Sequence, residues 1–469
     1  MRRKAKFFYN CFSPVSSKKE KHILKLRFLG GAREVGRSSI HVSGSHNTLL
    51  DCGVKFSGEQ EQYPLLEKHE AQALDKVVIS HAHLDHSGYA PGLYAQGYAG
   101  KTFLTKPTRD LMQLLLADYV KLAKERGVTP FSDRHVNKLL QNTEMLEYDD
   151  EKGWDGHGVR FQQAGHVLGS SLVELSEQKK LLYTGDLSLR ETRLLEPAKL
   201  GISAQVLITE STYGSRNDKH PSLKSASASF IASVKKTLER GGKVLIPTFA
   251  VGRGQEVLFT LESFMRSQAL PEVPIYLDGM VKKALRIYRH NAIYLKREVQ
   301  LRILSSEDDP FKSEHYRVPE TKDRSDVVQG EACIILATSG MLTGGPILHY
   351  LKELGNDANN SLILVGYQGE GTPGRALLQG SKEMEIDGQA YPLSLEVLQA
   401  PFSAHADHDQ LIEFAKSVQG LEKVFVVHGE GSKSDELAAD IEKQCNKAKG
   451  SHAQKVQAIV PDLGGEYQA

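Results

Sequence analysis

Four side chains of the kinds that bind metal ions fall within six consecutive positions, His81-Ala82-His83-Leu84-Asp85-His86. The segment follows the apolar run 77–79, and four such groups in six residues cannot all point one way from a strand or a helix. We therefore expect a loop that wraps around one or more ions. Imidazole and carboxylate without thiolate suit Zn²⁺ or a similar divalent ion, and burying so many polar groups without compensation would be costly.

More residues of these kinds share one setting, because each stands shortly after an apolar run that predicts a strand. They are His166, Asp186, Glu210, His405 and His428. If these strands run in one direction, all five side chains emerge at the same edge of the structure, where such folds collect chemistry. The chain has 18 histidines. The position after a predicted strand distinguishes these candidates from the rest. Three others with equally polar neighbours, His157, His408 and His452, we assign to the surface.

The apolar runs that predict strands and helices change character twice along the chain. Up to about residue 210, short strand-like runs alternate with Gly-rich turns, which is typical of a β-rich layer. Over 211–385 strands alternate with helices, which predicts a parallel sheet covered by helices. Beyond 386 the first pattern resumes. We expect an αββα sandwich over 23–210 and 386–469, interrupted by an inserted α/β domain over 211–385. The clearest later elements are helices over 225–240 and 254–267 and strands over 393–398, 423–427 and 456–460.

Length and composition suit a soluble globular protein of two domains. The chain has 469 residues, 40% hydrophobic and 25% charged, which is enough to bury a large core. Its four cysteines are scattered with no C-x-x-C pair. That pattern argues against a disulfide framework and a thiolate zinc site and favours a reducing compartment, the cytoplasm. No stretch approaches the roughly 18 uninterrupted apolar residues of a membrane helix, so we expect no membrane span.

Net charge is close to neutral, at +1. Any affinity for a polyanion must therefore come from a local basic surface. The clearest basic excess lies in residues 1–22. We interpret this segment as a solvated, disordered tail, with an auxiliary contact to nucleic acid as the alternative.

Several short motifs follow one another in a set order. The first four are H-A-H-L-D-H with Asp51 upstream, A-G-H-V-L-G-S at 164–170, Y-T-G-D at 183–186 and E-S-T-Y-G at 210–214. F-S-A-H-A-D at 402–407 and V-H-G-E at 427–430 come last. Together they resemble the motifs of the metallo-β-lactamase superfamily and its β-CASP branch. The similarity runs from about Leu24 nearly to the C-terminus, and it best matches the endonuclease subunit of the cleavage and polyadenylation specificity factor and its archaeal relatives.

Two departures from these relatives stand out. Ser39 occupies a position where many of them have cysteine. Archaeal relatives often carry RNA-binding KH domains ahead of the core, whereas here only the basic segment precedes it. The resemblance is therefore to a form without KH domains, and the substrate range of the relatives is not carried over.

The resemblance implies a cofactor of two zinc ions per chain. It implies that one ion is bound by three histidines, namely His81, His83 and His166. It implies that the other ion is bound by Asp85, His86 and His428, and that Asp186 bridges the two. A hydroxide between the ions would then attack phosphorus, because metals lower the pKa of bound water.

Three further residues have implied catalytic roles. Asp51 would accept a hydrogen bond from a ligand imidazole and fix its orientation. His405 would protonate the leaving 3′-oxygen, while Glu210 orients that imidazole and keeps it protonated. The products would carry 5′-phosphate and 3′-hydroxyl ends.

Three segments between the motifs, 243–256, 337–346 and 366–375, resemble the inserted β-CASP domain. The resemblance implies that this domain forms the second wall of a substrate groove. Its loops offer backbone N–H groups, hydroxyls and guanidinium groups, all of which can bind phosphate. The expected substrate-binding residues are Arg253, Ser339, Gly340 and Arg375. The Gly-rich loops are also compatible with plain turns.

The implied function is hydrolysis of RNA, single-stranded RNA in particular, in RNA processing or decay. The sequence leaves open endonuclease against 5′ to 3′ exonuclease, and a homodimer against a subunit of a processing complex. Three alternatives compete. A small-molecule hydrolase would not need the inserted domain, and a non-catalytic RNA-processing scaffold would have lost ligands. A DNA nuclease of the Artemis type typically has valine at the position of His428.

Overall fold

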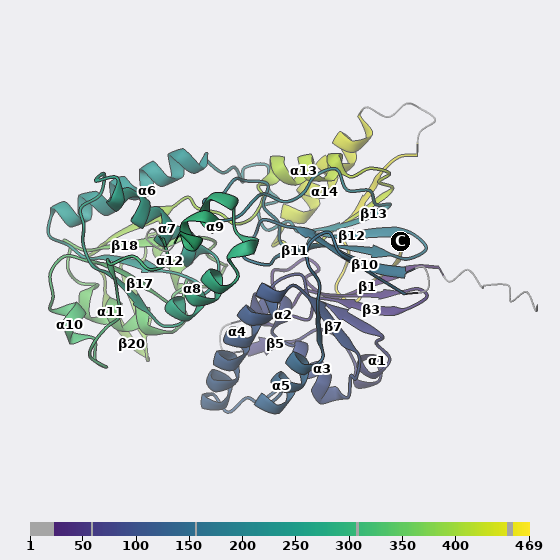
Figure 1. Ribbon diagram of the computed structural model, residues 1–469, viewed down its shortest axis with the longest axis horizontal. Coiled ribbons are helices and arrows are strands. Elements are labelled where there is room, and N and C mark those ends of the chain that lie inside the picture. The colour runs from purple at the N-terminus through teal and green to yellow at the C-terminus, as the bar shows by residue number, and fades with distance from the viewer. Residues whose placement is uncertain (1–22, 58–59, 155–156, 306–308, 448–453) are drawn as a thin grey trace, which may run out of the picture.

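Two seven-stranded sheets stack face to face, and a third, six-stranded sheet lies beside them (Figure 1). The computed structural model describes residues 23–57, 60–154, 157–305, 309–447 and 454–469. The tail predicted over 1–22 lies outside the described residues. Helices cover the outer faces of the stacked pair, so the predicted αββα sandwich with an inserted α/β domain is confirmed.

The two stacked sheets use strands from distant parts of the chain. The first has the order β24 (Glu466–Gln468), β1 (Lys25–Gly30), β2 (Ser39–Ser43), β3 (Asn47–Leu50), β6 (Lys76–Val78), β7 (Lys101–Leu104) and β8 (Thr143–Met145). The second has the order β23 (Gln457–Ile459), β22 (Lys423–Val426), β13 (Val206–Thr209), β12 (Lys180–Tyr183), β11 (Ser171–Ser176), β10 (His157–Gln163) and β9 (Glu151–Trp154). β24 pairs with β1, so the C-terminal segment extends the first sheet.

Alternate residues of these strands fill the space between the sheets, because successive strand side chains point to opposite faces. Phe28, Phe161 and Phe425 are fully buried in this layer. The rings of Phe28 and Phe425 lie 5.2 Å apart, so the two sheets are in direct contact. This packing fixes where the strands end.

Each helix of the sandwich turns one apolar side to a sheet. α4 (Lys106–Glu125) buries residues spaced three and four apart, as a surface helix does. Thr105 caps it by accepting a hydrogen bond from the Thr108 N–H. The other helices are α1 (Lys68–Gln72), α2 (Leu84–Ser87), α3 (Ala90–Gln96) and α5 (Asp133–Gln141) beside the first sheet, and α13 (His408–Ser417) and α14 (Lys433–Asn446) over the second.

The inserted domain is built on a parallel sheet, as the alternation of strands and helices predicts. Its order is β16 (Tyr316–Arg317), β15 (Ile275–Asp278), β17 (Ile334–Ala337), β14 (Val244–Pro247), β18 (Ser361–Val365) and β21 (Glu396–Ala400). Every neighbouring pair is parallel. Its helices are α6 (Leu223–Glu239), α7 (Arg253–Arg266), α8 (Val281–His290), α9 (Arg297–Leu304), α10 (Ser325–Val328), α11 (Pro346–Leu354) and α12 (Pro373–Leu378).

One strand belongs to a different sheet than predicted. The run 393–398 was expected in the returning part of the sandwich, but the strand forms as β21 and pairs in parallel with β18. That prediction is wrong, because an apolar run indicates a strand without indicating its partner. The chain therefore returns to the sandwich only after Ala400.

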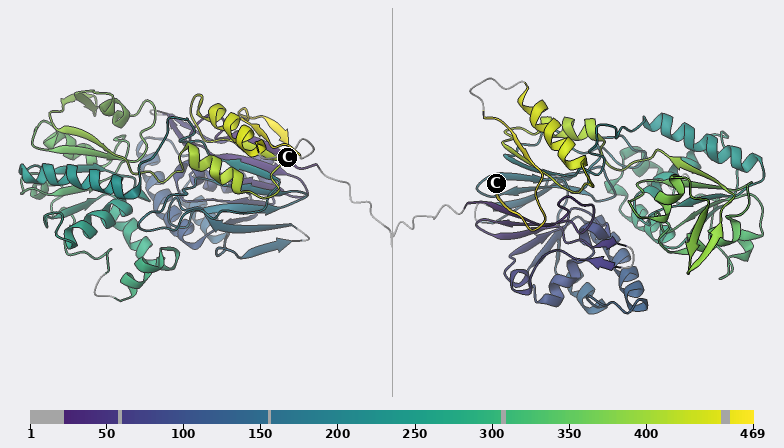
Figure 2. Two further views of the ribbon diagram at one scale, coloured as in Figure 1. Left: turned by 90° about the horizontal axis from the view of Figure 1, so that it is seen from above. Right: turned by 180° about the vertical axis from the view of Figure 1, so that it is seen from behind.

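Short elements complete the structure. They are the hairpins β4 (Lys55–Ser57) with β5 (Gln60–Gln62) and β19 (Glu383–Ile386) with β20 (Gln389–Pro392), and the 3₁₀ turn Ala292–Tyr294. Within the described ranges, no helix is long and apolar enough to cross a membrane. Both views in Figure 2 show the inserted domain against one end of the sandwich and the C-terminus at the opposite end.

Candidate metal centre

The metal-type side chains predicted at strand ends gather at one edge of the sandwich. In the second sheet β12, β13 and β22 are adjacent and parallel, so their carboxyl ends lie together. In the first sheet β3 and β6 are also parallel. The residues that follow these five strands are Asp186, Glu210, His428, Asp51 and His81. Parallel pairing is thus what assembles the site.

His81, His83, His166 and Asp186 form the first cluster, with one ligand-type atom of each within 4.8 Å of the others. His83 Nδ1 lies 3.2 Å from His81 Nε2 and 3.1 Å from His166 Nε2. Asp186 Oδ2 lies 3.5 Å from His81 Nε2 and 3.6 Å from His166 Nε2. Three imidazoles and a carboxylate around one point are a donor set that zinc uses.

Asp85, His86 and His428 form the second cluster, also within 4.8 Å. His428 Nε2 lies 3.3 Å from Asp85 Oδ2. Asp186 Oδ1, the other oxygen of the same carboxylate, lies 3.3 Å from His86 Nε2 and 3.5 Å from His428 Nδ1. Asp186 therefore turns one oxygen to each cluster.

The segment that carries four of these groups is not wholly the loop we expected. His83 is the N-cap of α2, so Asp85 and His86 lie on one helical turn, and the loop prediction is wrong for them. The turn satisfies buried backbone groups, since the N–H groups of His86 and Ser87 donate to His83 O. Neighbouring helical residues point roughly 100° apart, which still lets Asp85 and His86 face different sides of the centre.

The chemistry of these donors fits divalent cations. Burial raises the pKa of Asp186, but the surrounding histidines, His86 foremost, outweigh this and hold it well below its ordinary value. Burial also lowers the pKa of His81 and His166 well below the usual range, so both imidazoles are neutral and able to ligate. In the described part of the chain, the buried Asp186 Oδ1 has no hydrogen-bond partner. A buried, ionised carboxylate oxygen without a hydrogen bond is costly unless a cation lies beside it.

Asp51 lies beneath the second cluster, fully buried. Its Oδ2 is 2.7 Å from His86 Nδ1 and accepts hydrogen bonds from the Ser80 and Tyr183 hydroxyls, both at 2.7 Å. The Ser80 N–H donates to Oδ1 at 2.7 Å. This arrangement turns His86 Nε2 toward Asp186, which is how a carboxylate orients a ligand histidine.

Two more imidazole rings of the clusters are held by groups that the sequence patterns did not single out. His166 Nδ1 lies 3.0 Å from Ala404 O, and His428 Nδ1 lies 3.2 Å from Thr212 Oγ1. Both partners stand within motifs quoted above, which is the signal that could have singled them out. Each contact directs one ring nitrogen away from solvent and toward a defined partner.

His405 reaches the centre by another route, through the loop that follows β21 of the inserted sheet. Its Nδ1 lies 3.0 and 2.9 Å from the two oxygens of Glu210, which is fully buried and also accepts from the Leu187 N–H at 2.8 Å. Burial lowers the pKa of His405, but the charges of Glu210 and Asp186 outweigh it and raise the pKa above its ordinary value. With Nδ1 engaged by Glu210, Nε2 is the ring nitrogen that could exchange a proton with a substrate.

The inserted domain touches the centre through the loop before α7. Val251 O lies 3.4 Å from His83 Nε2. Gly252 has φ 97°, and a Cβ there would lie 2.8 Å from Val167 Cγ1, so glycine permits this close approach. The next residue, Arg253, is buried, and its Nε has no hydrogen-bond partner among the described residues. Its charge lowers the pKa of the His405 imidazole, so Arg253 lies near His405.

Ser339 and Gly340 lie further out, on the loop after β17. A Cβ on Gly340 would come within 2.9 Å of Phe249 N, in the same loop that reaches His83. The Ser339 hydroxyl accepts from the Thr343 N–H at 3.1 Å. These two residues therefore border the loop that contacts the centre.

Arg375 is exposed on α12. Burial raises the pKa of Tyr367, and the nearby charge of Arg375 acts to lower it. The Tyr367 ring centroid lies 5.7 Å from that of Tyr213. Tyr213 in turn lies 6.0 Å from the His405 ring. A line of aromatic rings thus connects Arg375 to the centre.

The three histidines assigned to the surface have different outcomes. His408 is buried, with Nδ1 2.7 Å from Gly214 O and Nε2 3.2 Å from Asp440 Oδ2, so its assignment is wrong. Polar sequence neighbours did not reveal the helix α14 that packs over it. His157 is half-buried beside Glu177, and its surface assignment is also wrong. His452 lies outside the described residues.

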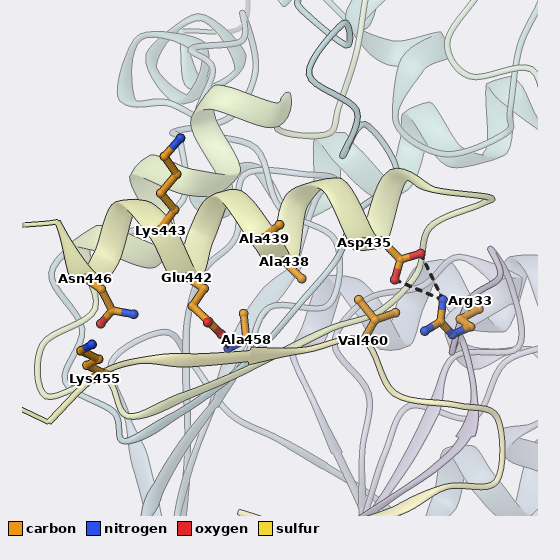
Figure 3. Close-up of a pocket in the computed structure, with 10 residues that line it drawn as sticks. All are labelled: Arg33, Asp435, Ala438, Ala439, Glu442, Lys443, Asn446, Lys455, Ala458 and Val460. Carbon is orange, nitrogen blue, oxygen red and sulfur yellow. Dashed lines mark hydrogen bonds and ion pairs between the residues drawn. The ribbon is translucent and has the colours of Figure 1, made fainter.

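A surface hollow of about 600 Å³ lies elsewhere, between α14 and β23 (Figure 3). Its charged groups are already paired in part, since Arg33 lies 3.2 Å from Asp435 and 3.1 Å from Asp462. It contains none of the clusters described here, and we place the chemistry at the strand ends instead.

Comparison with known families accounts for most of the chain. Residues 33–232 match the family described as the metallo-beta-lactamase superfamily, and 254–377 match the Beta-Casp domain. Residues 390–456 match the Zn-dependent metallo-hydrolase RNA specificity domain. The matched regions contain both clusters and His405, and the loop before α7 lies just ahead of the Beta-Casp match.

Individual relatives agree with these families. The transcription termination factor FttA of Methanocaldococcus jannaschii is 40% identical over 442 residues, covering 90% of this chain and 70% of the relative. An RNase J-like protein of the same organism is 38% identical over 420 residues, covering 89% of this chain and 95% of that protein. A solved structure of a protein of unknown function from Enterococcus faecalis has a TM-score of 0.56 at 13% identity, covers 95% of this chain and all of its own, and shows the fold alone. The chain therefore belongs to the metallo-hydrolases of the metallo-β-lactamase superfamily, in its β-CASP branch.

Proposed function

We propose that this protein is a zinc-dependent ribonuclease that hydrolyses RNA phosphodiester bonds in RNA processing or decay. The observation that carries the proposal is Asp186, which turns one oxygen to each of two histidine-rich clusters. His405 and Glu210 beside them supply a proton donor and its partner. The RNase J-like name of one relative and the RNA specificity family support RNA as the substrate.

Each group of the centre has a task in this proposal. His81, His83 and His166 would hold one zinc ion, Asp85, His86 and His428 the other, and Asp186 both. Zinc bound there would supply a nucleophile from water at neutral pH and offset phosphate charge.

The proton donor and the phosphate contact come from the chain itself. His405 donates a proton from Nε2 to the leaving 3′-oxygen, while Glu210 holds Nδ1 and stabilises the protonated ring. Arg253 would contact the phosphate, which its burial and its Nε without a hydrogen-bond partner among the described residues support.

The alternatives explain less of the site. A scaffold protein has no need for a complete ligand set with its supporting hydrogen bonds. A small-molecule hydrolase does not account for the inserted-domain loop 3.4 Å from His83. The relatives named transcription termination factors support a role on transcripts. The described cysteines are free thiols, which suits the cytoplasm as the location.

Chelation is expected to abolish cleavage, and added zinc to restore it, because water is a poor nucleophile at neutral pH without the ions. We expect the centre to hold two zinc ions. Elemental analysis measures this as the difference in zinc content between the wild type and the double variant His83→Ala/His86→Ala, which removes one ligand from each cluster. The exposed His69 provides the matched control, His69→Ala. An active preparation from which the centre's zinc is absent would disprove the metal mechanism.

RNA, and single-stranded RNA in particular, is expected to be cut far faster than DNA. His428 completes the second cluster, where Artemis-type DNA nucleases typically have valine, and a buried centre admits a flexible strand more easily than a duplex. The assay compares RNA and DNA of one sequence, single-stranded and duplex, at one salt concentration. Equal or faster cleavage of DNA would overturn the choice of substrate and leave the two-zinc proposal intact. Labelling either end of the RNA separates endonuclease from exonuclease products.

A further inference from the structure

A second group of metal-type side chains lies at the opposite edge of the sandwich. His46 is in the turn between β2 and β3, His157 is the first residue of β10, and Glu177 is in the turn between β11 and β12. One ligand-type atom of each lies within 4.8 Å of the others. The two imidazole rings are 4.8 Å apart at 73°. Lys25 in β1 pairs with Ser43 at the end of β2 and with Gln468 near the C-terminus. The C-terminus lies at the end of the sandwich opposite the inserted domain (Figure 2), so this edge faces away from that domain.

The atoms that could bind an ion are buried and unsatisfied. In the ranges that the structure describes, His46 Nδ1, His157 Nδ1 and Glu177 Oε2 have no hydrogen-bond partner. The Glu177 side chain is only 2% exposed and that of His157 17%. A buried carboxylate oxygen without a hydrogen bond is costly, so a partner for it is to be expected.

A proton alone does not satisfy the group. His157 Nδ1 and Glu177 Oε2 are 2.9 Å apart, but their orientation is outside hydrogen-bond geometry, and the pair would leave His46 Nδ1 without a partner. Burial lowers the pKa of Lys76. The charge of Glu177 opposes this effect and raises the pKa of Lys76, so the two side chains lie near each other. Lys76 thus offsets part of the carboxylate charge without donating a hydrogen bond to Oε2. A cation satisfies all three atoms at once.

We propose that His46, His157 and Glu177 form a third metal site, separate from the catalytic centre, for zinc or a similar divalent transition ion. Two imidazoles and a carboxylate, with water in the remaining position, are a donor set that such ions accept. The ligands come from three places far apart in the sequence and from both sheets. The ion would tie the β2–β3 turn of the first sheet to β10 and the β11–β12 turn of the second.

The test measures zinc content and stability of the full chain. The double variant His46→Ala/His157→Ala is expected to bind one zinc ion fewer than the wild type after dialysis at a fixed free zinc concentration. Its thermal midpoint is expected to gain less from added zinc, because binding to the folded state stabilises it. RNA cleavage is expected to stay unchanged, since none of these residues belongs to the catalytic centre. The matched control is His69→Ala, an exposed histidine 3.2 Å from Glu67.

Two further variants keep the proposal falsifiable. Glu177→Gln preserves size and should fold while losing the ion, whatever the double variant does. His83→Ala/His86→Ala should retain the third ion while losing those of the centre, so failure of the catalytic proposal is distinguishable from failure of this one. Equal zinc content in the wild type, Glu177→Gln and His46→Ala/His157→Ala would overturn the third site.

Discussion

Replacing Asp186 with alanine is expected to abolish RNA cleavage, lowering kcat by at least about 10³-fold, and to remove zinc from both clusters. Its two oxygens lie between 3.3 and 3.6 Å from four histidine nitrogens, so one side chain faces both clusters. Metal ions contribute several kcal/mol to such transition states, and each ~1.4 kcal/mol is tenfold in rate. Single-turnover rates and elemental analysis on the same preparation measure both losses.

Two variants show whether the loss is specific. Asp186→Asn keeps the volume of the side chain and removes its charge, so it should fold and still lose metal and activity. Asp133→Ala removes an exposed aspartate on α5, paired with Lys124, and should change neither. Wild-type zinc content and turnover in Asp186→Ala would place the metal site elsewhere.

His405→Ala is expected to slow the cleavage of ordinary RNA by about 10²-fold or more while the zinc ions remain bound. The side chain belongs to neither ligand cluster, and its Nδ1 is held by Glu210. Under the proposed mechanism, its loss would remove the proton for the leaving 3′-oxygen and leave the nucleophile in place. The rate and the zinc content are measured together, so that a catalytic loss is separated from a loss of metal.

A modified substrate isolates the proton transfer. RNA with sulfur in place of the 3′-bridging oxygen releases a thiolate, which leaves without protonation, so His405→Ala should cut it almost as fast as the wild type does. Equal slowing on both substrates would make His405 a positioning residue. Near-normal rates on ordinary RNA would assign proton donation to another group.

The sequence was sufficient to predict the fold and to predict that the ligand-type residues gather at one edge of the sandwich. Strand ends could be located because apolar runs end abruptly before Asp186 and His428, and parallel pairing then brings those residues together. The division of the residues between two zinc ions stays a prediction. The sandwich and the inserted parallel sheet are confirmed, because their hydrophobic patterns differ along the chain.

Other features depend on packing that no local pattern encodes. Val251 contacts His83 through its backbone carbonyl, which any residue type would provide. The partner of β21 and the burial of His408 under α14 depend on which surfaces meet in three dimensions. The His46, His157 and Glu177 group was missed for the same reason, since its members are isolated in the sequence and lie on two turns and at the start of β10.

The centre draws its side chains from nearly the whole length of the chain. Asp85 and His428 are in contact across 343 positions of sequence, and β1 pairs with β24. During synthesis on the ribosome, the second cluster therefore stays incomplete until residue 428 has emerged, and the first sheet lacks its edge strand until the last residues follow. A nascent chain that ends before His428 therefore lacks part of the second cluster, however well its own strands have folded.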